Sequence, residues 1–209
     1  MSKKGILTVI SGFSGAGKGT IVKELVKKHN YGLSISATSR KPREGEQHGR
    51  EYFFLTREEF QCMIENGQLI EWAEYVGNYY GTPKEYVENQ LAQGKDIILE
   101  IEIEGAFQVK ELFKDALLLF ITPPSAGELK NRLFQRGTET EEVIKKRLAR
   151  AYEEADYMEK YDYNVVNDQL DECVEQVHCI IQNQKLKASY QNYFAKEMKT
   201  QLKIFQEGE

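Results

Sequence analysis

The order of hydrophobic and polar positions along the 209-residue chain predicts strands that alternate with helices. Helical spacing follows the first apolar run, where Ile21, Leu25 and Lys28 recur at intervals of three to four residues. Such alternation predicts an α/β fold with a doubly wound, mostly parallel sheet that binds ligands at the carboxyl ends of its strands. Three apolar runs have the length of buried strands: ILTVIS at 6–11, DIILEIEI at 96–103 and ALLLFITP at 116–123. YNVVN at 163–167 predicts the last strand.

The stretch from about residue 37 to 93 breaks this rhythm. YFFLT at 52–56 and the glycine-containing, aromatic segment LIEWAEYVGNYYGTP predict antiparallel strands, so we expect an inserted lobe after a short core strand at 31–36. Three predicted helix starts carry the S/T-x-x-E capping-box pattern, which satisfies N–H groups of the first helical turn: Thr56 with Glu59, Thr82 with Glu85, and Ser125 with Glu128.

The first predicted strand and helix are joined by GFSGAGKGT, residues 12–20. This loop fits the phosphate-binding pattern G-x-x-x-x-G-K-[ST], except that Gly19 stands where the pattern has a hydroxyl and Thr20 follows one position later. Glycines let backbone N–H groups turn inward, the helix N-terminus adds positive potential, and Lys18 can reach the outer phosphates. An ordinary tight turn is the alternative, but the glycine spacing with lysine next, between a strand and a helix, favours a nucleoside triphosphate.

Net charge, cysteine spacing and the length of apolar runs limit which classes of function the chain can have. With 28 Lys and Arg against 33 Asp and Glu, the net charge of −5 gives no overall basic field for nucleic acid or a membrane surface, so any anion site must be local. Cys62, Cys173 and Cys179 lack metal-ligand spacing and fit reduced thiols of a cytoplasmic protein. The apolar stretch at the N-terminus is too short for a signal peptide, and no apolar run reaches membrane length.

The arginines gather in two segments, whereas the lysines are spread along the whole chain. A guanidinium group grips phosphate oxygens at two points, so two arginine clusters indicate two phosphate-bearing ligands. Solvated helix faces are the simpler interpretation for a single arginine, and we prefer it for Arg57 and Arg150. The eight arginines are Arg40, Arg43, Arg50, Arg57, Arg132, Arg136, Arg147 and Arg150.

Five ordered segments after the SGFSGAGKGT loop resemble the guanylate kinase family, and the match runs from about residue 5 to 185. The resemblance implies a P-loop nucleoside monophosphate kinase that transfers the γ-phosphoryl group of ATP to GMP, and to dGMP, in purine nucleotide metabolism. It also implies a core (1–36, 94–131 and 151–187), a GMP-binding lobe (37–93), a lid (132–150) and a helical tail (188–209). The segments are SATSRKPREGEQHGREYFFLTREEF, LIEWAEYVGNYYGTP, EIEIEGA, RLFQRGTETEEVIKKRL and YDYNVVND.

The same resemblance assigns site residues. The catalytic cations that meet the ATP phosphates and the transferred group would be Lys18, Arg132, Arg136 and Arg147. The ATP site would comprise Gly12, Phe13, Ser14, Gly15, Ala16, Gly17, Lys18, Gly19 and Thr20, with Asn167 near adenine. The GMP phosphate would be held by Arg40, Arg43, Tyr52 and Tyr80, and the guanine would be lined by Ser36, Glu71, Thr82 and Glu102.

Two departures from the family pattern concern magnesium and guanine. Glu100 and Glu102 stand where the family often has an aspartate pair, and Glu104 stands where glutamine is usual. Alternation along the predicted strand places Glu100 and Glu102 on one face. Because Gly19 cannot ligate a metal, we expect no direct protein ligand: Mg²⁺ would be held by ATP oxygens and water, with Glu100 ordering that water.

Other interpretations stay open at this point. Some domains resembling guanylate kinase bind protein partners without catalysis, and a P-loop kinase can also act on another monophosphate or a small-molecule acceptor. Beyond residue 185 the resemblance fades, and Tyr190, Phe194, Met198 and Leu202 form an apolar stripe on a predicted helix. We expect this stripe to pack on the chain's own core; the alternative is contact with a second copy in a homodimer, or with another partner.

Overall fold

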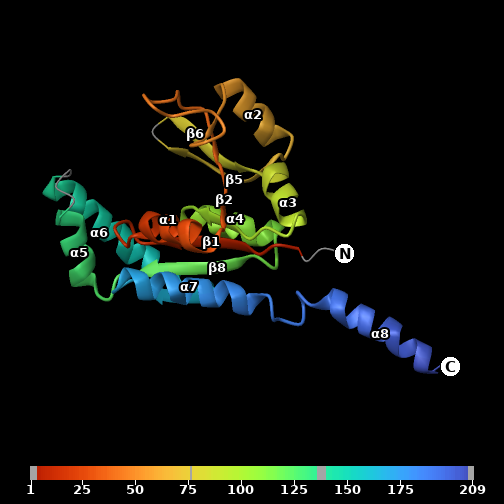
Figure 1. The fold of residues 1–209 in the computed structure, drawn as a ribbon. Helices are drawn as coiled ribbons and strands as arrows, with labels where there is room; N and C mark the ends of the chain where they lie inside the picture. Colours follow the sequence, from red (N-terminus) through yellow and green to blue (C-terminus); the bar gives the residue numbers. More distant parts are fainter. Residues whose placement is uncertain (1–3, 76, 136–139, 207–209) are drawn as a thin grey trace.

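The structure is a computed structural model that describes residues 4–75, 77–135 and 140–206. Its centre is a five-stranded parallel sheet in the order β2-β7-β1-β8-β9 (Figure 1). The expected α/β class with a parallel core sheet is confirmed. The strands are β1 (Leu7–Gly12), β2 (Gly32–Leu33), β7 (Ile97–Glu100), β8 (Leu117–Thr122) and β9 (Tyr163–Val166).

Helices cover this sheet and close one large hydrophobic core. The core takes Ile10 and Leu99 from the strands and Ile21 and Leu25 from the first helix, all buried. The helices outside the lobe and tail are α1 (Lys18–His29), α4 (Ile103–Leu112), α5 (Ala126–Gln135), α6 (Glu141–Ala155) and α7 (Leu170–Gln184), with a 3₁₀ turn at Met158–Lys160. No helix among the described residues is long and apolar enough to cross a membrane.

The strand predicted at 96–103 is shorter than its apolar run. It ends at Glu100, and α4 begins at Ile103. Ile103, Ala106 and Val109 are spaced three residues apart and are all buried. The chain after Glu102 therefore follows the spacing of a helix and not the alternation of a strand. Glu102 is therefore the N-cap of α4, and the prediction that it shares a strand face with Glu100 is wrong.

The expected inserted lobe is a second, four-stranded sheet in the order β4-β3-β6-β5, which stands above the core in Figure 1. Its strands are mostly antiparallel, as predicted, but β3 and β4 are parallel. A small core of Ala37, Phe60, Leu69 and Tyr79 holds it together. Its elements are β3 (Ala37–Thr38), β4 (Phe53–Phe54), α2 (Arg57–Glu65), β5 (Leu69–Tyr75), β6 (Asn78–Pro83) and α3 (Lys84–Ala92).

The three predicted capping boxes have three outcomes. At the start of α2, the Thr56 hydroxyl accepts from the Glu59 N–H and the Glu59 carboxylate accepts from the Thr56 N–H, so this box is confirmed. At α5, Ser125 caps the Glu128 N–H at 3.1 Å, but the Glu128 carboxylate pairs with an arginine instead. The box at Thr82 is wrong, because Thr82 lies within β6 and Pro83 is the N-cap of α3.

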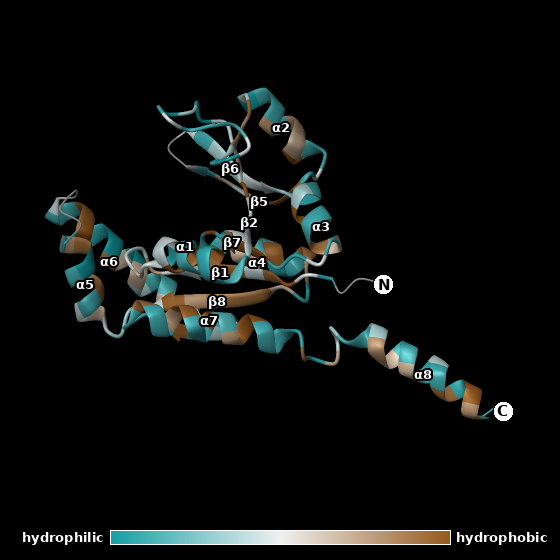
Figure 2. Cartoon of the chain, in the orientation of Figure 1, coloured by the Kyte–Doolittle hydropathy of each residue, from teal (hydrophilic) through white to brown (hydrophobic). Residues whose placement is uncertain are grey.

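The tail forms α8 (Asn192–Gln206), which projects away from the rest of the molecule (Figure 1). Figure 2 shows apolar residues along it, and Phe194, Met198 and Leu202 are 51%, 40% and 52% exposed. The expectation that this stripe packs on the chain's own core is wrong for these three residues, because α8 diverges from the core. It holds only for the half-buried Tyr190, which packs against the core and donates its hydroxyl to the Asp115 carbonyl at 2.8 Å.

Candidate nucleotide-binding site

The glycine loop lies at the carboxyl end of β1 and leads directly into α1. Gly17 is the N-cap of α1 with φ 92°, and Gly12 has φ 142°, both in the region that favours glycine. A Cβ at Gly12 would lie 2.0 Å from the Ile121 carbonyl oxygen of β8, and a Cβ at Gly17 would lie 2.6 Å from the Asn167 amide nitrogen. The Ile121 backbone therefore leaves no room for a side chain at Gly12, and the positive φ favours glycine at Gly17. The loop leads to the N-terminus of α1, the kind of helix end that attracts anions.

Lys18 begins α1 and turns back over the loop. Its ammonium group donates to the Gly12 carbonyl at 2.6 Å and to the Phe13 carbonyl at 3.2 Å. The side chain is half-buried, and its ammonium group lies against the loop and does not extend into solvent. A cation in this position raises the affinity of the loop for phosphate oxygens.

Asn167 braces the loop from the end of β9. Its side chain is buried and donates to the Ala16 carbonyl at 2.8 Å, while its backbone N–H donates to the Thr122 carbonyl at 2.7 Å. The structure thus joins Asn167 to the predicted ATP loop through the protein itself. Contact with adenine stays a prediction.

Arginines from α5 and α6 lie beside the loop and beside the residue that braces it. Arg147 of α6 donates to the Ser14 hydroxyl. Arg132 of α5 donates to the Asn167 carbonyl at 3.0 Å and pairs with Glu128 at 2.7 Å. Arg136, the third predicted arginine of this group, lies outside the described residues. Lys18 and Arg147 therefore contact the loop directly, and Arg132 contacts Asn167, the residue that braces it.

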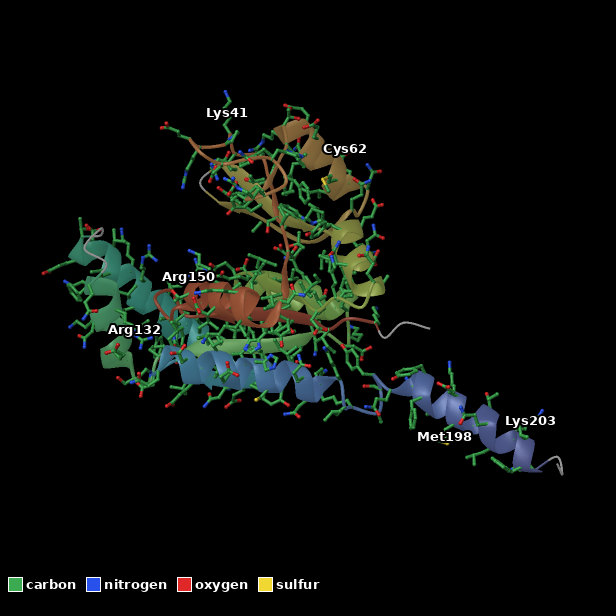
Figure 3. The ribbon with its side chains drawn as sticks, in the orientation of Figure 1. Lys41, Cys62, Arg132, Arg150, Met198 and Lys203 are labelled. Carbon is green, nitrogen blue, oxygen red and sulfur yellow. The ribbon has the colours of Figure 1, made fainter. Side chains whose placement is uncertain are left out.

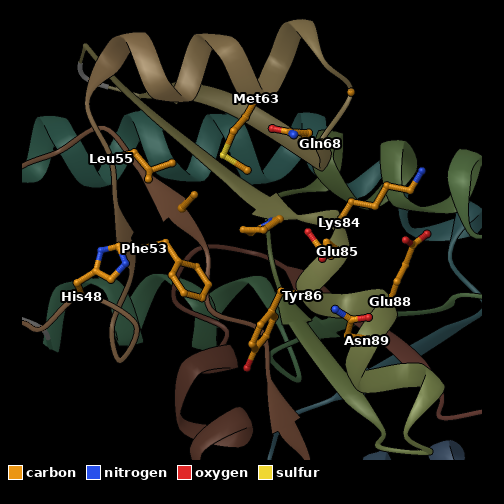
Figure 4. A pocket seen from close by; sticks show the side chains of 13 residues that line it. His48, Phe53, Leu55, Met63, Gln68, Lys84, Glu85, Tyr86, Glu88 and Asn89 are labelled. Atoms are coloured by element: carbon orange, nitrogen blue, oxygen red, sulfur yellow. The ribbon is translucent and has the colours of Figure 1, made fainter.

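A hollow of about 150 Å³ lies between the core sheet and the inserted lobe. It brings together residues from β2, β7 and the lobe that are far apart in the sequence. Four predicted site residues line it, namely Ser36, Tyr52, Thr82 and Glu100. A separate, larger cavity of about 630 Å³ lies within the lobe, lined by Phe53, Leu55, Met63 and Tyr86 among others (Figure 4), and it contains none of the predicted site residues.

Arg40 is held rigidly at the lobe side of the site. Its guanidinium forms two bonds of 3.0 Å to Glu46, lies 5.5 Å from the centre of the Tyr52 ring, and has a side chain only 15% exposed. Tyr80 is close to Tyr52, with ring centres 6.0 Å apart. The structure therefore groups Arg40, Tyr52 and Tyr80, three of the four residues predicted for the GMP phosphate.

Glu46 is a residue that the sequence reasoning missed. Besides the pair with Arg40, its carboxylate accepts from the backbone N–H of Arg43 at 2.7 Å. These bonds, that from Arg40 above all, lower the pKa of Glu46, so it stays ionised and orients the guanidinium. A glutamate six residues after Arg40 in a glycine-containing loop was the available signal. The side chain of Arg43 is exposed, and its contact with phosphate stays a prediction.

Glu71 is 7% exposed and accepts from the Thr82 hydroxyl at 2.7 Å. Its second oxygen faces α4, where a Cβ at Gly105 would come within 2.9 Å. Burial raises the pKa of Glu71, and the hydrogen bonds from Thr82 oppose that rise. Inward and outward side chains do not alternate regularly at the start of this strand, because the register shifts between Leu69 and Trp72 and the residues Leu69, Ile70 and Glu71 are all buried.

Glu100 and Glu102 have different surroundings. Glu100 opens to the hollow, and its carboxylate lies 3.5 Å from the place a Cβ would occupy at Gly19. Crowding by protein on its other sides raises the pKa of Glu100, and Lys18 and Lys23 oppose the rise. Glu102 is exposed and pairs with Arg150 at 3.1 Å. Arg150 is exposed, as preferred from the sequence, but its two partners were not foreseen.

No group of His, Cys, Asp or Glu within the described ranges is arranged to hold a metal ion by itself. Arg57, one of the arginines of the lobe, forms an ion pair with Glu74 at 3.1 Å and donates to the Tyr79 hydroxyl at the same distance. It does not line the hollow. Figure 3 shows Arg132 and Arg150 on the side of the molecule that carries α5 and α6. The site thus consists of a glycine loop that carries a lysine ammonium group and, next to it, a hollow whose carboxylates can accept hydrogen bonds.

Comparison with known proteins agrees with this geometry. The guanylate kinase family model matches residues 4–184. A guanylate kinase of Bacillus anthracis is 52% identical over 199 residues, which cover 94% of this chain and 97% of that protein. A guanylate kinase of Clostridium tetani is 51% identical over 183 residues, 88% of each chain. The crystal structure of guanylate kinase from Anaplasma phagocytophilum superposes with a TM-score of 0.70 at 32% identity and covers 90% of each chain. The chain therefore belongs to the guanylate kinase family.

Proposed function

We propose that this enzyme transfers the γ-phosphoryl group of ATP to GMP, giving ADP and GDP, with ATP on the glycine loop and GMP in the hollow beneath the lobe. One observation carries the proposal. The hollow that gathers Ser36, Tyr52 and Thr82 also contains Glu100, whose carboxylate lies beside Gly19 of the loop. The two nucleotide sites are therefore adjacent, as direct transfer between bound substrates requires.

On the ATP side, backbone N–H groups of the loop and the N-terminus of α1 would hold the phosphates. Lys18, Arg132 and Arg147 would stabilise the charge on the transferred group, together with Arg136 as predicted from the sequence. Phosphoryl transfer needs positioning and charge stabilisation and no nucleophilic side chain, so this set is sufficient in kind. Asn167 would act by keeping the loop in shape, through its bond to the Ala16 carbonyl.

The residues beside the loop fit a magnesium ion that arrives with ATP. Mg²⁺ prefers oxygen ligands and keeps much of its water, and the oxygen donors here are the exposed Thr20 hydroxyl and the Glu100 carboxylate. Glu100 would act through a bound water. Burial raises the pKa of its carboxyl, and the ammonium group of Lys18 opposes that rise. When bound, the ion would neutralise charge on the ATP phosphates.

On the GMP side, Arg40, Arg43, Tyr52 and Tyr80 would hold the phosphate. The hollow is smaller than the roughly 300–1,000 Å³ typical of ligand pockets, so GMP would extend beyond it toward Arg40. Glu46 would keep the Arg40 fork aimed at the phosphate.

The guanine base would be read by Ser36, Glu71, Thr82 and Glu102. Glu71 already uses one oxygen to accept from Thr82, and its other oxygen is available to the ring N–H and amino group of guanine. Adenine has a bare ring nitrogen at that place, so two acceptors would face each other. We expect AMP to be rejected by about 10⁴- to 10⁵-fold, because the buried acceptor would be left unpaired. We expect dGMP to be accepted.

A coupled assay of ADP release tests this function, with GMP, dGMP, AMP, UMP and CMP compared at saturating Mg-ATP. Strong turnover with GMP and dGMP alone supports it. Tight GMP binding without turnover would identify a partner-binding module, and preference for another acceptor would identify a different kinase. We place the enzyme in the cytoplasm, since Cys62, Cys173 and Cys179 are free thiols.

We also propose that α8 forms a homodimer contact. Its exposed apolar side chains Met198, Leu202 and Phe205 are spaced four and three residues apart, as in the seam of a coiled coil. Sedimentation velocity of the full chain should give a dimer, and the double variant M198E/L202E should give a monomer with unchanged activity. A monomeric wild type at micromolar concentration would refute this contact.

A further inference from the structure

Arg150 lies where α6 passes the first turn of α4, and it contacts a carboxylate on each helix. Its Nε donates to Glu154 Oε1 at 2.8 Å, within α6. Its Nη2 donates to Glu102 Oε2 at 3.1 Å, across to α4. Arg150 therefore bridges two elements that are separated by 48 positions in the sequence.

The two ends of this bridge differ in burial. The Glu154 side chain is 11% exposed, whereas the side chains of Arg150 and Glu102 are 60% and 70% exposed. Burial raises the pKa of Glu154, and the bond and charge of Arg150 oppose that rise. Glu154 therefore anchors the guanidinium, while the Glu102 end is open to solvent and to ligand. An exposed ion pair adds little to folding stability, so the effect of the Glu102 contact is mainly on position.

The same helix also touches the ATP loop. Arg147, three residues before Arg150, donates to the Ser14 hydroxyl of the loop. Residues three apart share one face of a helix. One turn of α6 thus reaches the ATP loop through Arg147 and the predicted guanine reader Glu102 through Arg150.

We propose that Arg150 is a positioning residue that couples the two nucleotide sites: anchored on Glu154, it orients Glu102 for guanine and ties α6, with Arg147, to the bound GMP. The inference rests on the proposed function, because it takes Glu102 as a guanine contact. Arg150 occupies Oε2 of Glu102, and a carboxylate has acceptor capacity left on its other oxygen for the guanine amino group. Binding of either nucleotide then favours the same placement of α6, and such coupling is reciprocal.

The variant Arg150→Met removes both contacts of the guanidinium and keeps the apolar stem. We expect the KM for GMP to rise about 5- to 30-fold, within the usual range of coupling between sites, and kcat to change by less than about 3-fold. Calorimetric affinity for GMP, measured with and without a non-hydrolysable ATP analogue, should show the analogue tightening GMP binding in the wild type. In the variant this enhancement should fall toward 1.

Lys146→Met is the matched control. Lys146 lies on the same helix and pairs with Glu142 at 3.1 Å, and both of these side chains are exposed. It should leave both KM values and the coupling unchanged. Arg150→Met also leaves Glu154 buried without its partner, so the double variant Arg150→Met/Glu154→Gln removes that charge and restores stability. The double variant should retain the raised KM for GMP.

A double-mutant cycle with Glu102→Gln tests the route of the effect. If Arg150 acts through Glu102, adding Arg150→Met to Glu102→Gln should change the KM for GMP by less than about 2-fold, since residues in contact are not additive. Wild-type KM and coupling in the folded Arg150→Met enzyme would overturn the inference, as would full additivity in the cycle. Failure of the proposed function is distinguishable, because the wild-type enzyme would then not phosphorylate GMP.

Discussion

Replacing Glu71 by Gln should weaken the use of GMP while leaving the fold intact. The Thr82 hydroxyl donates to Glu71 Oε1 at 2.7 Å, and glutamine can keep this bond through its own amide oxygen. Its amide nitrogen, however, would face guanine with two donors where the carboxylate offers an acceptor. The change therefore affects the face toward the base and spares the face toward Thr82.

The magnitude follows from the hydrogen bonds that would be lost. Hydrogen bonds to a charged group contribute about 1.5–3 kcal/mol, and leaving a guanine donor opposite another donor adds about 1 kcal/mol or more. At about 1.4 kcal/mol per decade, kcat/KM for GMP should fall about 60- to 700-fold. The KM for ATP should stay within about 2-fold, because the hydrogen bond of Glu71 is made to Thr82 of the lobe and not to the glycine loop.

The Glu71→Gln change should not lower the free energy of unfolding, although it lowers activity toward GMP. Burial raises the pKa of Glu71, so the folded state holds the proton more tightly than the unfolded chain. Ionising this carboxylate as the pH rises above its unfolded-state pKa therefore lowers the free energy of unfolding. Glutamine removes that loss, and the melting temperature at pH 8 should be unchanged or higher. For the wild type, kcat/KM for GMP should decline on acidification at a higher pH than an ordinary glutamate would give.

The assay is coupled detection of diphosphate formation, with GMP varied at saturating Mg-ATP and a thermal melt of each variant. Glu74→Gln is the control, because Glu74 lies on the same strand but is exposed and pairs with Arg57. If the folded Glu71→Gln enzyme kept wild-type kcat/KM for GMP and still excluded AMP, Glu71 would not read the base. Glu102 would then be the remaining carboxylate for that role.

Three further outcomes are expected. Lys18→Ala should lower kcat by at least about 10²-fold through loss of a cation at the transferred phosphate, and near-normal turnover of a folded variant would contradict this role. Asn167→Ala should raise the KM for ATP about 2- to 10-fold, the effect of one neutral hydrogen bond to the loop; an unchanged KM would show that the loop holds its shape alone. Trp72 is 40% exposed, follows Glu71 and contacts the Tyr79 ring, so GMP should change intrinsic fluorescence saturably. A flat trace with binding confirmed by calorimetry would argue against movement at this strand.

The sequence by itself determined the elements that depend on local pattern. The glycine loop between β1 and α1 follows from residues 12–20 alone, because glycine conformations and a helix start are properties of neighbouring residues. The buried strands β1 and β8 follow from apolar runs of the kind that parallel sheets bury, whereas β9, at the edge of the sheet, is mostly exposed. The inserted lobe was visible as a change of that rhythm, and the ordered segments indicated the family.

The tertiary structure alone decided which charges meet. Arg40 with Glu46, and Arg150 with Glu102 and Glu154, are pairs set by how loops and helices pack, and arginine looks the same in the sequence whether it is paired or solvated. The end of β7 was decided by the core, which buries Ile103 and Ala106 on a helix rather than a strand. The path of α8 was decided in the same way: an apolar stripe shows that a surface needs covering, but only packing determines whether the chain's own core can reach it.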